Sequence, residues 1–224
     1  MLKRFFIMVR YAGLLLKIGG PRMFLSQLRR QLYSKDILFG LDKDLDAQRV
    51  KVASKSSYFL RPASNGDMEE LLARAKEESK QSVHELVERR WFYECGFKGC
   101  YVARNSDTGE ICFIAWLISA NDSELVSQGF KDRLPGLKEG ELLLENCYTF
   151  EKYRGNNIMP SVVVELQEMA RDRGFKRMVT CVRQDNRASL RAFEKLAFRK
   201  FEEIPELKIL FFTKRKHGNG KYTG

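Results

Sequence analysis

One segment of the sequence combines residues and a spacing that suit the binding of a phosphorylated ligand. It runs from Tyr153 to Met159, Tyr-Arg-Gly-Asn-Asn-Ile-Met, between a predicted apolar strand and a predicted amphipathic helix. A backbone that turns sharply from strand into helix points several N–H groups at one place, where an anion can bind. We therefore expect this segment to bind a phosphorylated cofactor.

The predicted strand before this turn, residues 142–150, carries three residues with possible chemical roles. Glu145 is the first candidate for a general base, because a carboxylate in an apolar strand is unfavourable unless it is paired or used. An equally favoured interpretation is that the Glu145 carboxylate lies on an exposed face of the sheet or is paired with a nearby Arg. Tyr148 is the second candidate, as an acid or a donor to substrate, although ordinary strand packing is favoured. Cys147 has no basic partner at hand, which favours a core thiol over a nucleophile.

Composition limits the remaining classes of protein. The chain has 224 residues, of which 44% are hydrophobic and 31% are charged, as in one soluble domain with or without an appendage. Five cysteines without a CxxC pair indicate thiols in a reducing, cytoplasmic compartment. With only His84 and His217 available, neither a His-rich metal site nor a Ser-His-Asp triad is expected. We predict no metal.

The net charge of +11 is concentrated at the two ends of the chain. Residues 1–50 contribute +6 and residues 214–224 add four basic residues, whereas residues 51–213 are nearly balanced. Basic ends are typical of solvated tails, or of attraction to an anionic membrane surface, an acidic carrier protein or nucleic acid. Nucleic acid is the least favoured of these partners.

The N-terminal part predicts two short, basic, amphipathic helices. They cover residues 2–18 and 22–33 and are separated by Gly19-Gly20-Pro21. Their apolar runs are too short to span a bilayer, but residues 1–33 could lie on the inner face of a membrane or contact a partner. Packing on the domain itself, or on the other copy of a homodimer, is slightly favoured. Residues 34–57 are expected to be a connector.

From residue 58 onward, predicted strands and helices alternate. The strands are 58–61, 100–104, 111–118, 142–150, 176–182, 198–201 and 207–212, and the helices are one capped by Asp67 or Asn65, then 83–93, 156–173 and 186–196. A long loop with a short helix is expected at 120–140. This order predicts an α/β protein with a mixed sheet covered on both faces. The expected parts are a helical extension and connector (1–50), the main domain (51–213) and a basic tail (214–224).

Residues 58–213 resemble the GNAT superfamily of coenzyme-A-dependent N-acyltransferases. Three pieces carry the resemblance in the expected order: Phe59 to Ser64 with Asp67, then Tyr148 to Gly155, and finally Asn186 and Ser189 with Phe193 to Phe198. The resemblance implies a central twisted mixed sheet flanked by helices, with a helical extension at the N-terminus.

Acetyl-CoA is the co-substrate that the resemblance implies. Amides from Arg154 to Met159 would hold the pyrophosphate, and Asn186 would bind the pantetheine arm. N–H groups near Tyr148, in a strand splayed from 176–182, would polarise the thioester carbonyl. The cofactor-binding residues expected in this way are Cys147, Thr149, Arg154, Gly155, Asn156, Asn157, Ile158, Met159, Asn186, Ser189 and Phe193.

The sequence also departs from the family pattern. Asn157 and Met159 stand where the family has small residues. Asn tolerates a left-handed backbone, so position 157 can still form the turn, whereas Met159 should crowd a phosphate. Phe193 stands where the family commonly has a Tyr that reprotonates the departing thiolate, and a phenyl ring cannot donate that proton. Ala197 in place of Gly is a milder change.

Two classes of function follow from the resemblance. The first is an N-acetyltransferase that moves the acetyl group of acetyl-CoA to the primary amine of a small acceptor, an amino sugar or an amino acid derivative, by direct attack. A long acyl chain delivered by an acyl carrier protein is its variant. The second is a catalytically inactive GNAT-like binding or membrane-associated module. Arg154 and Asn186 favour the first class, and Met159 and Phe193 favour the second.

Overall fold

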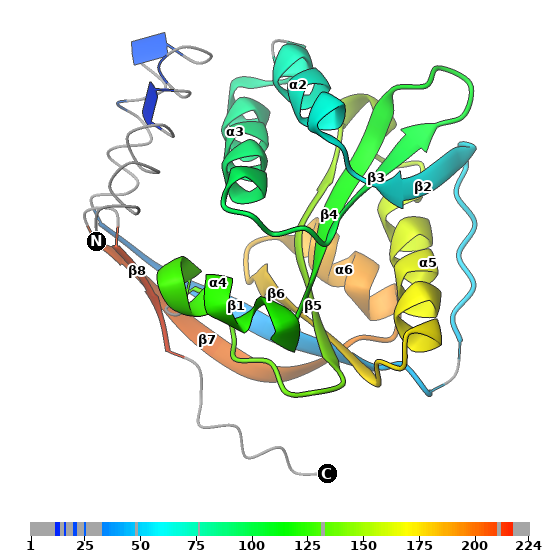
Figure 1. Cartoon of the computed structure of the whole chain (residues 1–224), viewed down its shortest axis with the longest axis vertical. Coiled ribbons are helices and arrows are strands. Elements are labelled where there is room, and N and C mark those ends of the chain that lie inside the picture. The colour runs from blue at the N-terminus through cyan, green and yellow to red at the C-terminus, as the bar shows by residue number, and fades with distance from the viewer. Residues whose placement is uncertain are drawn as a thin grey trace. The chain divides into compact units, whose positions relative to one another are not determined.

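The computed structural model describes residues 33–47, 49–75, 77–130, 133–209 and 212–216, with a few isolated positions before residue 33. Within these ranges the chain forms a mixed α/β fold (Figure 1). The strands are β1 (Tyr33–Asp44), β2 (Tyr58–Pro62), β3 (Cys100–Asn105), β4 (Ile111–Ser119), β5 (Glu141–Thr149), β6 (Arg177–Arg183), β7 (Arg199–Ile209) and β8 (Phe212–Arg215). The helices are α2 (Asn65–Arg74), α3 (Lys80–Glu94), α4 (Ser123–Leu125), α5 (Ile158–Asp172) and α6 (Arg187–Lys195).

The eight strands form one mixed sheet in the order β2-β3-β4-β5-β6-β1-β7-β8. β5 and β6 run parallel, with Glu141–Leu143 opposite Arg177–Val179. The pairs β1–β6, β1–β7, β2–β3, β3–β4 and β7–β8 are antiparallel. This arrangement confirms the predicted fold class.

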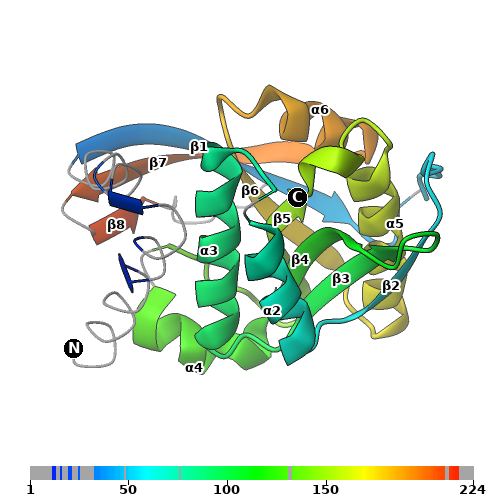
Figure 2. The same ribbon diagram turned by 90° about the horizontal axis from the view of Figure 1, so that it is seen from above.

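The chain divides into two compact units. The first comprises residues 54–117 and 146–159, together with the described positions among residues 1–29. Its helices α2 and α3 lie side by side (Figures 1 and 2). Its core is aromatic, because Phe92 stacks on Phe97 with ring centroids 4.4 Å apart and meets Trp116 edge-on at 5.3 Å. This unit contains the segment that the sequence predicts to bind a phosphorylated cofactor.

The second unit comprises the described residues within 30–53, 118–145 and 160–224. Within it, β7 runs beside β1, and β8 lies next to β7 (Figure 2). Its buried apolar side chains come from α5, α6 and the strands; they include Val162, Val163, Leu166, Met178, Leu196 and Ile204. The spacing of Val162 and Leu166 is that of one helix face, as the sequence predicts for this helix.

The segment that was expected to be a connector contains a strand of the sheet. β1 comprises 12 residues and pairs with β6 on one side and β7 on the other. Its partners lie more than 130 residues further along the chain, so nothing in the local pattern indicates the pairing. The segment 214–216, assigned to the tail, likewise contains the end of β8. The helices expected at 2–18 and 22–33 lie almost entirely outside the described residues.

Two further details of the element predictions were wrong. The N-cap of α2 is Ser64, whose hydroxyl accepts the Asp67 amide, while the Asp67 carboxylate accepts the Ser64 amide in return. The strands expected at 198–201 and 207–212 are not separate in this way, because residues Arg199–Ile209 form one strand, β7, which continues through Pro205, and residue 212 begins β8. The Pro205 carbonyl accepts a hydrogen bond from the Lys216 amide at 3.0 Å. The Pro205 nitrogen, which has no hydrogen to donate, faces the same side as this carbonyl, so the hydrogen bonds between β7 and β1 are kept.

Candidate functional site

The turn between β5 and α5 has the backbone conformation that a ligand-binding loop requires. Gly155 has φ = 79° and Asn157 has φ = 56°, and α5 begins at Ile158. The prediction that Asn157 can take the left-handed conformation is therefore confirmed. Apart from its chain neighbours, no described heavy atom lies within 4 Å of the place that a Cβ would occupy at Gly155. A ligand can thus approach the backbone there, and the first amides of α5 have no acceptor within the helix.

The turn is held from outside by residues distant in the sequence. The Tyr153 hydroxyl donates to Glu110 at 2.6 Å and lies 3.0 Å from the Thr108 hydroxyl. The carbonyl oxygen of Asn156 accepts from the Lys55 amide at 2.9 Å. Phe150 donates its amide to the Cys112 carbonyl at 3.1 Å. These contacts fix the turn before any ligand binds, which favours binding because less chain entropy is lost.

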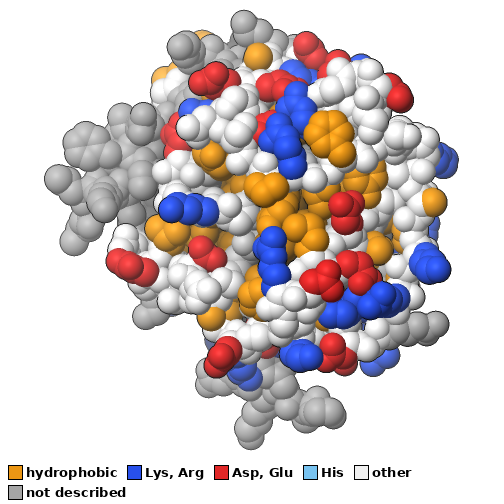
Figure 3. All heavy atoms as spheres, turned by 45° about the vertical axis from the view of Figure 1, so that its right-hand side comes forward, with side chains coloured by type: hydrophobic (Ala, Val, Ile, Leu, Met, Phe, Trp, Pro, Cys, Tyr) orange, Lys and Arg blue, Asp and Glu red, His pale blue; other side chains and the backbone are white. Residues whose placement is uncertain are grey.

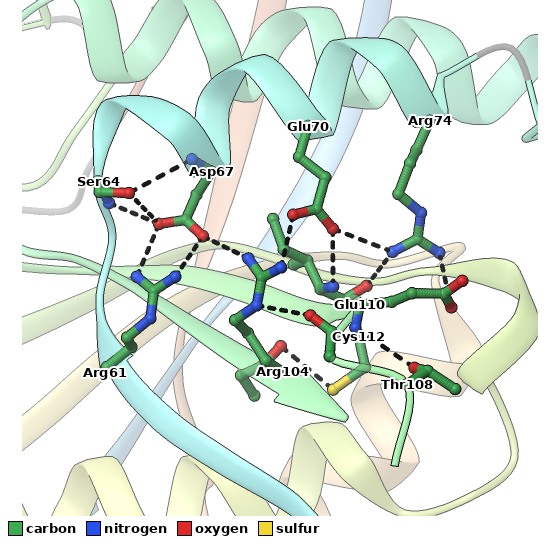
Figure 4. Close-up of polar contacts among 12 residues, drawn as sticks. Arg61, Ser64, Asp67, Glu70, Arg74, Arg104, Thr108, Glu110 and Cys112 are labelled. Atoms are coloured by element: carbon green, nitrogen blue, oxygen red, sulfur yellow. Dashed lines mark hydrogen bonds and ion pairs between the residues drawn. The ribbon is translucent and has the colours of Figure 1, made fainter. Parts of the chain in front are cut away.

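Glu110 connects the turn to a larger polar network over β2–β4 (Figure 4). Asp67 accepts from Arg61 and Arg104, each at 2.7 Å, and Arg104 also donates to Glu70. Arg74 lies 3.8 Å from Glu110. Burial alone would raise the pKa of Asp67, but the hydrogen bonds from Arg61 and then Ser64 lower it to about 2. The carboxylate is 1% exposed and stays ionised, so it fixes α2 to the strands.

Beside the turn, Glu151 lies at the N-terminus of α3. Its carboxylate accepts from the hydroxyls of Ser79 at 2.6 Å and Ser82 at 2.5 Å, and from the Ser79 amide at 3.3 Å. These hydrogen bonds lower the pKa of Glu151, and the bond from the Ser79 hydroxyl has the largest effect. Arg154 donates to the Thr149 carbonyl at 3.1 Å and lies 3.5 Å from Glu151. With half of its side chain exposed, Arg154 can exchange Glu151 for another anion.

Tyr148, a candidate catalytic residue, is buried against two arginines. Its hydroxyl donates to the Glu78 carboxylate at 2.7 Å. The guanidinium carbons of Arg89 and Arg154 lie 4.8 Å and 5.5 Å from the ring centroid. Burial, and then the bond to Glu78, raise the pKa of Tyr148 well above its ordinary value. The phenol therefore stays protonated and acts as a hydrogen-bond donor to Glu78.

Asn146 and Arg89, the residue that holds it, were not predicted from the sequence. Asn146 lies within β5 at φ = 55°, and its carbonyl accepts from Arg89 Nε at 3.0 Å. Arg89 Nη2 donates to the next carbonyl, that of Cys147, at 3.1 Å. Successive carbonyls of a regular strand point to opposite sides, so this shared donor marks an irregularity in β5. An Asn inside an apolar strand was the available signal, because Asn tolerates the left-handed region.

Glu145, the first candidate base, lies at the end of the second unit's part of β5. It is half-buried, and its charge acts on Cys181 and Arg215. Burial, and then Glu145, raise the pKa of the Cys181 thiol to about 12. Burial would lower the pKa of Arg215, but Glu145 and then Glu206 raise it. Glu145 is thus half-buried, and its charge also acts on Arg215. Both interpretations of Glu145, a general base and a carboxylate paired with an arginine, therefore keep a physical basis.

Burial is the main influence on the pKa of three of the thiols, those of Cys100, Cys112 and Cys181. The five cysteines form no disulfide. Burial also raises the pKa of Cys112 to about 11, and that of Cys100 further. Within the described ranges, no group of three or more His, Cys, Asp or Glu residues could hold a metal ion.

The second motif surrounds α6 in the second unit. Asn186 is the N-cap of this helix and accepts the Ser189 amide at 3.1 Å, which leaves its side-chain N–H groups to donate elsewhere. Phe193 is buried and meets Phe198 edge-on, with ring centroids 4.9 Å apart. Ala197 has φ = 61° and ends the helix. The aromatic ring of Phe193 is therefore part of the core of this unit.

Sequence and structure comparisons identify the family. The model of the acetyltransferase (GNAT) family matches residues 66–198, more than half of the chain. The chain belongs to the GNAT acetyltransferase family. The matched segment contains both motifs, the turn before α5 and the residues around α6. A comparison with curated proteins gives no match.

Solved GNAT structures share the fold at low sequence identity. A GCN5-related glucosamine N-acetyltransferase region of a fungal multi-domain GH3 β-N-acetylglucosaminidase has a TM-score of 0.58 and 16% identity, over 83% of this chain and 22% of that one. A GCN5-related N-acetyltransferase from Sphaerobacter thermophilus has a TM-score of 0.52 and 14% identity, over 85% of this chain and 55% of that one. A tandem GNAT protein from the clavulanic acid biosynthesis pathway has a TM-score of 0.52 and 12% identity, over 90% of this chain and 60% of that one. The chain thus spans less than two thirds of the length of these structures.

On the face drawn in Figure 3, described Lys and Arg side chains lie next to Asp and Glu side chains and do not gather into one basic patch. Pairs such as Lys152 with Glu110, 2.8 Å apart, are of this kind. None of the helices in the described ranges combines the length and apolar character needed to cross a membrane.

Proposed function

We propose that this GNAT protein is an N-acetyltransferase that moves the acetyl group of acetyl-CoA to the primary amine of a small acceptor, an amino sugar or an amino acid derivative, by direct attack. The observation that carries the proposal is the anchored turn before α5, with left-handed Gly155 and Asn157 in the segment that the family model matches. Such a turn leaves backbone N–H groups for a diphosphate.

The residues present fit coenzyme A at several points. The backbone at Gly155 is open, and the half-exposed Arg154 lies beside it to add positive charge. In the second unit, Asn186 keeps amide N–H groups for the pantetheine arm. Coenzyme A, when bound, supplies the acetyl group as an activated thioester. The chain would bind and orient it, and would donate backbone N–H groups near Thr149 to the thioester oxygen.

An acceptor that starts as an ammonium group loses two protons in the reaction, one before and one after its nitrogen attacks. An ammonium group has no lone pair, so the amine must be neutral before its nitrogen attacks the carbonyl carbon. The N–C bond then forms, the nitrogen loses its second proton, the C–S bond breaks, and the sulfur leaves as a thiolate whose uptake of a proton balances that loss. Glu145 remains the first candidate for the base. Tyr148 stays protonated, because burial and then the hydrogen bond to Glu78 raise its pKa, so it fits a residue that positions the acceptor together with Glu78 and not a base.

Calorimetry and a thiol assay test the proposal together. Titration of the full chain with acetyl-CoA should show binding, and a panel of amines should release free CoA thiol above the rate of hydrolysis. The panel should contain glucosamine, the amino sugar named for the fungal neighbour, and free amino acids. No heat of binding at millimolar acetyl-CoA would refute the enzymatic function.

A binding module without catalysis is the second candidate, and Phe193 favours it. The ring is 2% exposed and packs on Phe198, so this position offers no hydroxyl to the departing thiolate. This alternative predicts binding of acetyl-CoA without acceptor-dependent thiol release. The proposal also places the chain in the cytoplasm, which the thiol content and the lack of disulfides support.

A further inference from the structure

Arg89 is a buried cation at the irregular part of β5. It lies on α3, and only 5% of its side chain is exposed. Nε and Nη2 donate to the carbonyls of Asn146 and Cys147 at 3.0 Å and 3.1 Å. Under the proposed function, these peptide groups adjoin the thioester. The guanidinium is therefore located next to the place where the acceptor must present its amine.

The charge of Arg89 is balanced by the partly exposed carboxylate of Glu85. Nη1 donates to the carbonyl and to the carboxylate of Glu85, at 2.7 Å and 2.8 Å. Among the ion pairs of the described residues, Glu85 is the one acidic partner of Arg89, and 44% of its side chain is exposed. A guanidinium has five N–H groups, of which these contacts use four. A substrate carboxylate could thus take the place of Glu85 and gain a second bond.

The neighbourhood of Arg89 carries both signs of charge. The ring of Tyr148 lies 4.8 Å from the Arg89 guanidinium, and the hydroxyl of the same residue is bound to the Glu78 carboxylate. The Tyr148 side chain thus lies between the buried guanidinium of Arg89 and the half-buried carboxylate of Glu78. This arrangement is complementary to a molecule with a carboxylate and an ammonium group a few bonds apart. An amino sugar such as glucosamine has only the ammonium group.

We propose that the acceptor is an amine that also carries a carboxylate, a free amino acid or a derivative with its carboxyl group intact, and that Arg89 binds this carboxylate in exchange for Glu85. The inference rests on the proposed function and narrows it. Arg is suited to this role because its planar fork binds carboxylate with two parallel hydrogen bonds. Arg89 would determine the specificity for the acceptor and would take no part in proton transfer.

The test compares paired acceptors with the full chain and acetyl-CoA. Each of the twenty common amino acids is assayed beside its carboxamide, and glucosamine is included, with free-thiol release as the readout. At least one amino acid should have a kcat/KM about tenfold or more above that of its carboxamide, the factor for loss of a charge-assisted hydrogen bond. Equal use of acids and carboxamides, or a preference for glucosamine, would overturn the inference. Absence of turnover with every amine would instead refute the proposed function.

Two variants of α3 separate recognition from structure. In Arg89→Met, the KM for the preferred acid should rise about tenfold while the KM for its carboxamide and the affinity for CoA stay unchanged. The control is Arg90→Met, because Arg90 forms the neighbouring ion pair of α3 with Glu94 at 2.8 Å and should show wild-type values. An equal rise for acid and carboxamide in Arg89→Met would show a merely structural role.

A third variant keeps the inference testable if Arg89→Met does not fold. Glu85→Gln retains Arg89 and its bonds to β5 but removes the competing charge. The KM for the preferred acid should then fall severalfold, whereas the KM for the carboxamide should stay the same. A KM for the acid that is unchanged or raised in Glu85→Gln would contradict the exchange of carboxylates on Arg89.

Discussion

The two motifs that the sequence analysis singled out are held in place in different ways. The turn before α5 is held by side chains and backbone groups far away in the sequence, such as Glu110 and Lys55. The motif around α6 is closed within itself, because Asn186 caps its first turn and the Phe198 amide bonds the Phe193 carbonyl at 3.0 Å. The first motif therefore depends on the tertiary structure of its unit, whereas the second follows from local rules of helix capping.

The sharpest way to break the first motif is to remove Asp67. Asp67→Ala leaves Arg61 and Arg104 without their shared carboxylate, so we expect the free energy of unfolding to fall by about 3 kcal/mol. Urea denaturation measures the loss. The exposed Asp107 in the same unit is the matched control, and Asp107→Ala should stay within about 0.5 kcal/mol of the wild type. Equal effects of the two variants would contradict a special role for the network.

The same carboxylate predicts a dependence on pH. The pKa of Asp67 is about 2 in the folded chain and has an ordinary value of 3.8. A lowered folded pKa stabilises the protein above the unfolded pKa, and this stabilisation is lost as the pH falls from about 4 towards 2. Denaturation curves between pH 5 and pH 2 should therefore be less pH-dependent for Asp67→Ala than for the wild type. Parallel curves would exclude this ionisation as a source of stability.

Gly155→Val tests the turn itself. A β-branched residue disfavours φ = 79° by about 1–3 kcal/mol, so the dissociation constant for CoA should rise about tenfold. Asn157→Gly is the control, because glycine keeps the left-handed conformation and should bind CoA with the wild-type affinity. Calorimetry gives both constants. If Gly155→Val binds CoA as tightly as the wild type, the left-handed turn does not determine binding.

Asn186→Ala probes the start of the second motif. The helix loses its cap, so the free energy of unfolding should fall by about 1 kcal/mol, and the loss of one donor to the cofactor should raise the KM for acetyl-CoA about fivefold. Asn186→Ser keeps a capping oxygen and removes the amide N–H groups. It should therefore show the higher KM at nearly unchanged stability. An unchanged KM in both variants would argue against a cofactor contact at this residue.

Ala197→Gly gives the smallest expected effect and the only gain. Ala197 occupies the left-handed position that ends α6, so glycine should raise the free energy of unfolding by about 0.5–1 kcal/mol. Ala192→Gly, inside the same helix, should lower it by a similar amount, about 0.5–1 kcal/mol. Thermal unfolding distinguishes the two. A loss of stability in both variants would show that the end of α6 does not follow the local rule.

Prediction from the sequence succeeded where the determining contacts are close in the chain. The left-handed turn at Asn157 follows from the residue type, and the boundaries of α5 and α6 follow from periodicity and capping. It failed for β1, whose partners in β6 and β7 are distant, and for the cap of α2, where Ser64 and Asp67 share one reciprocal pair of bonds. The roles of Arg89 and Glu78 could not be predicted from the sequence, because an Arg on a helix and a Glu in the connection before it are both ordinarily solvated.

By itself, the sequence determined the α/β class, the family and the positions of the two motifs, because residue type and spacing fix turns, caps and periodic faces locally. The tertiary structure decided which groups meet. It placed Glu78 on the Tyr148 hydroxyl, Arg89 on the carbonyls of β5 and Glu151 on the first turn of α3. These contacts join residues 57 to 72 positions apart. Only the folded chain brings such residues within hydrogen-bond distance, and at the buried Tyr148 and Arg89 burial then makes the pairing of their polar groups obligatory.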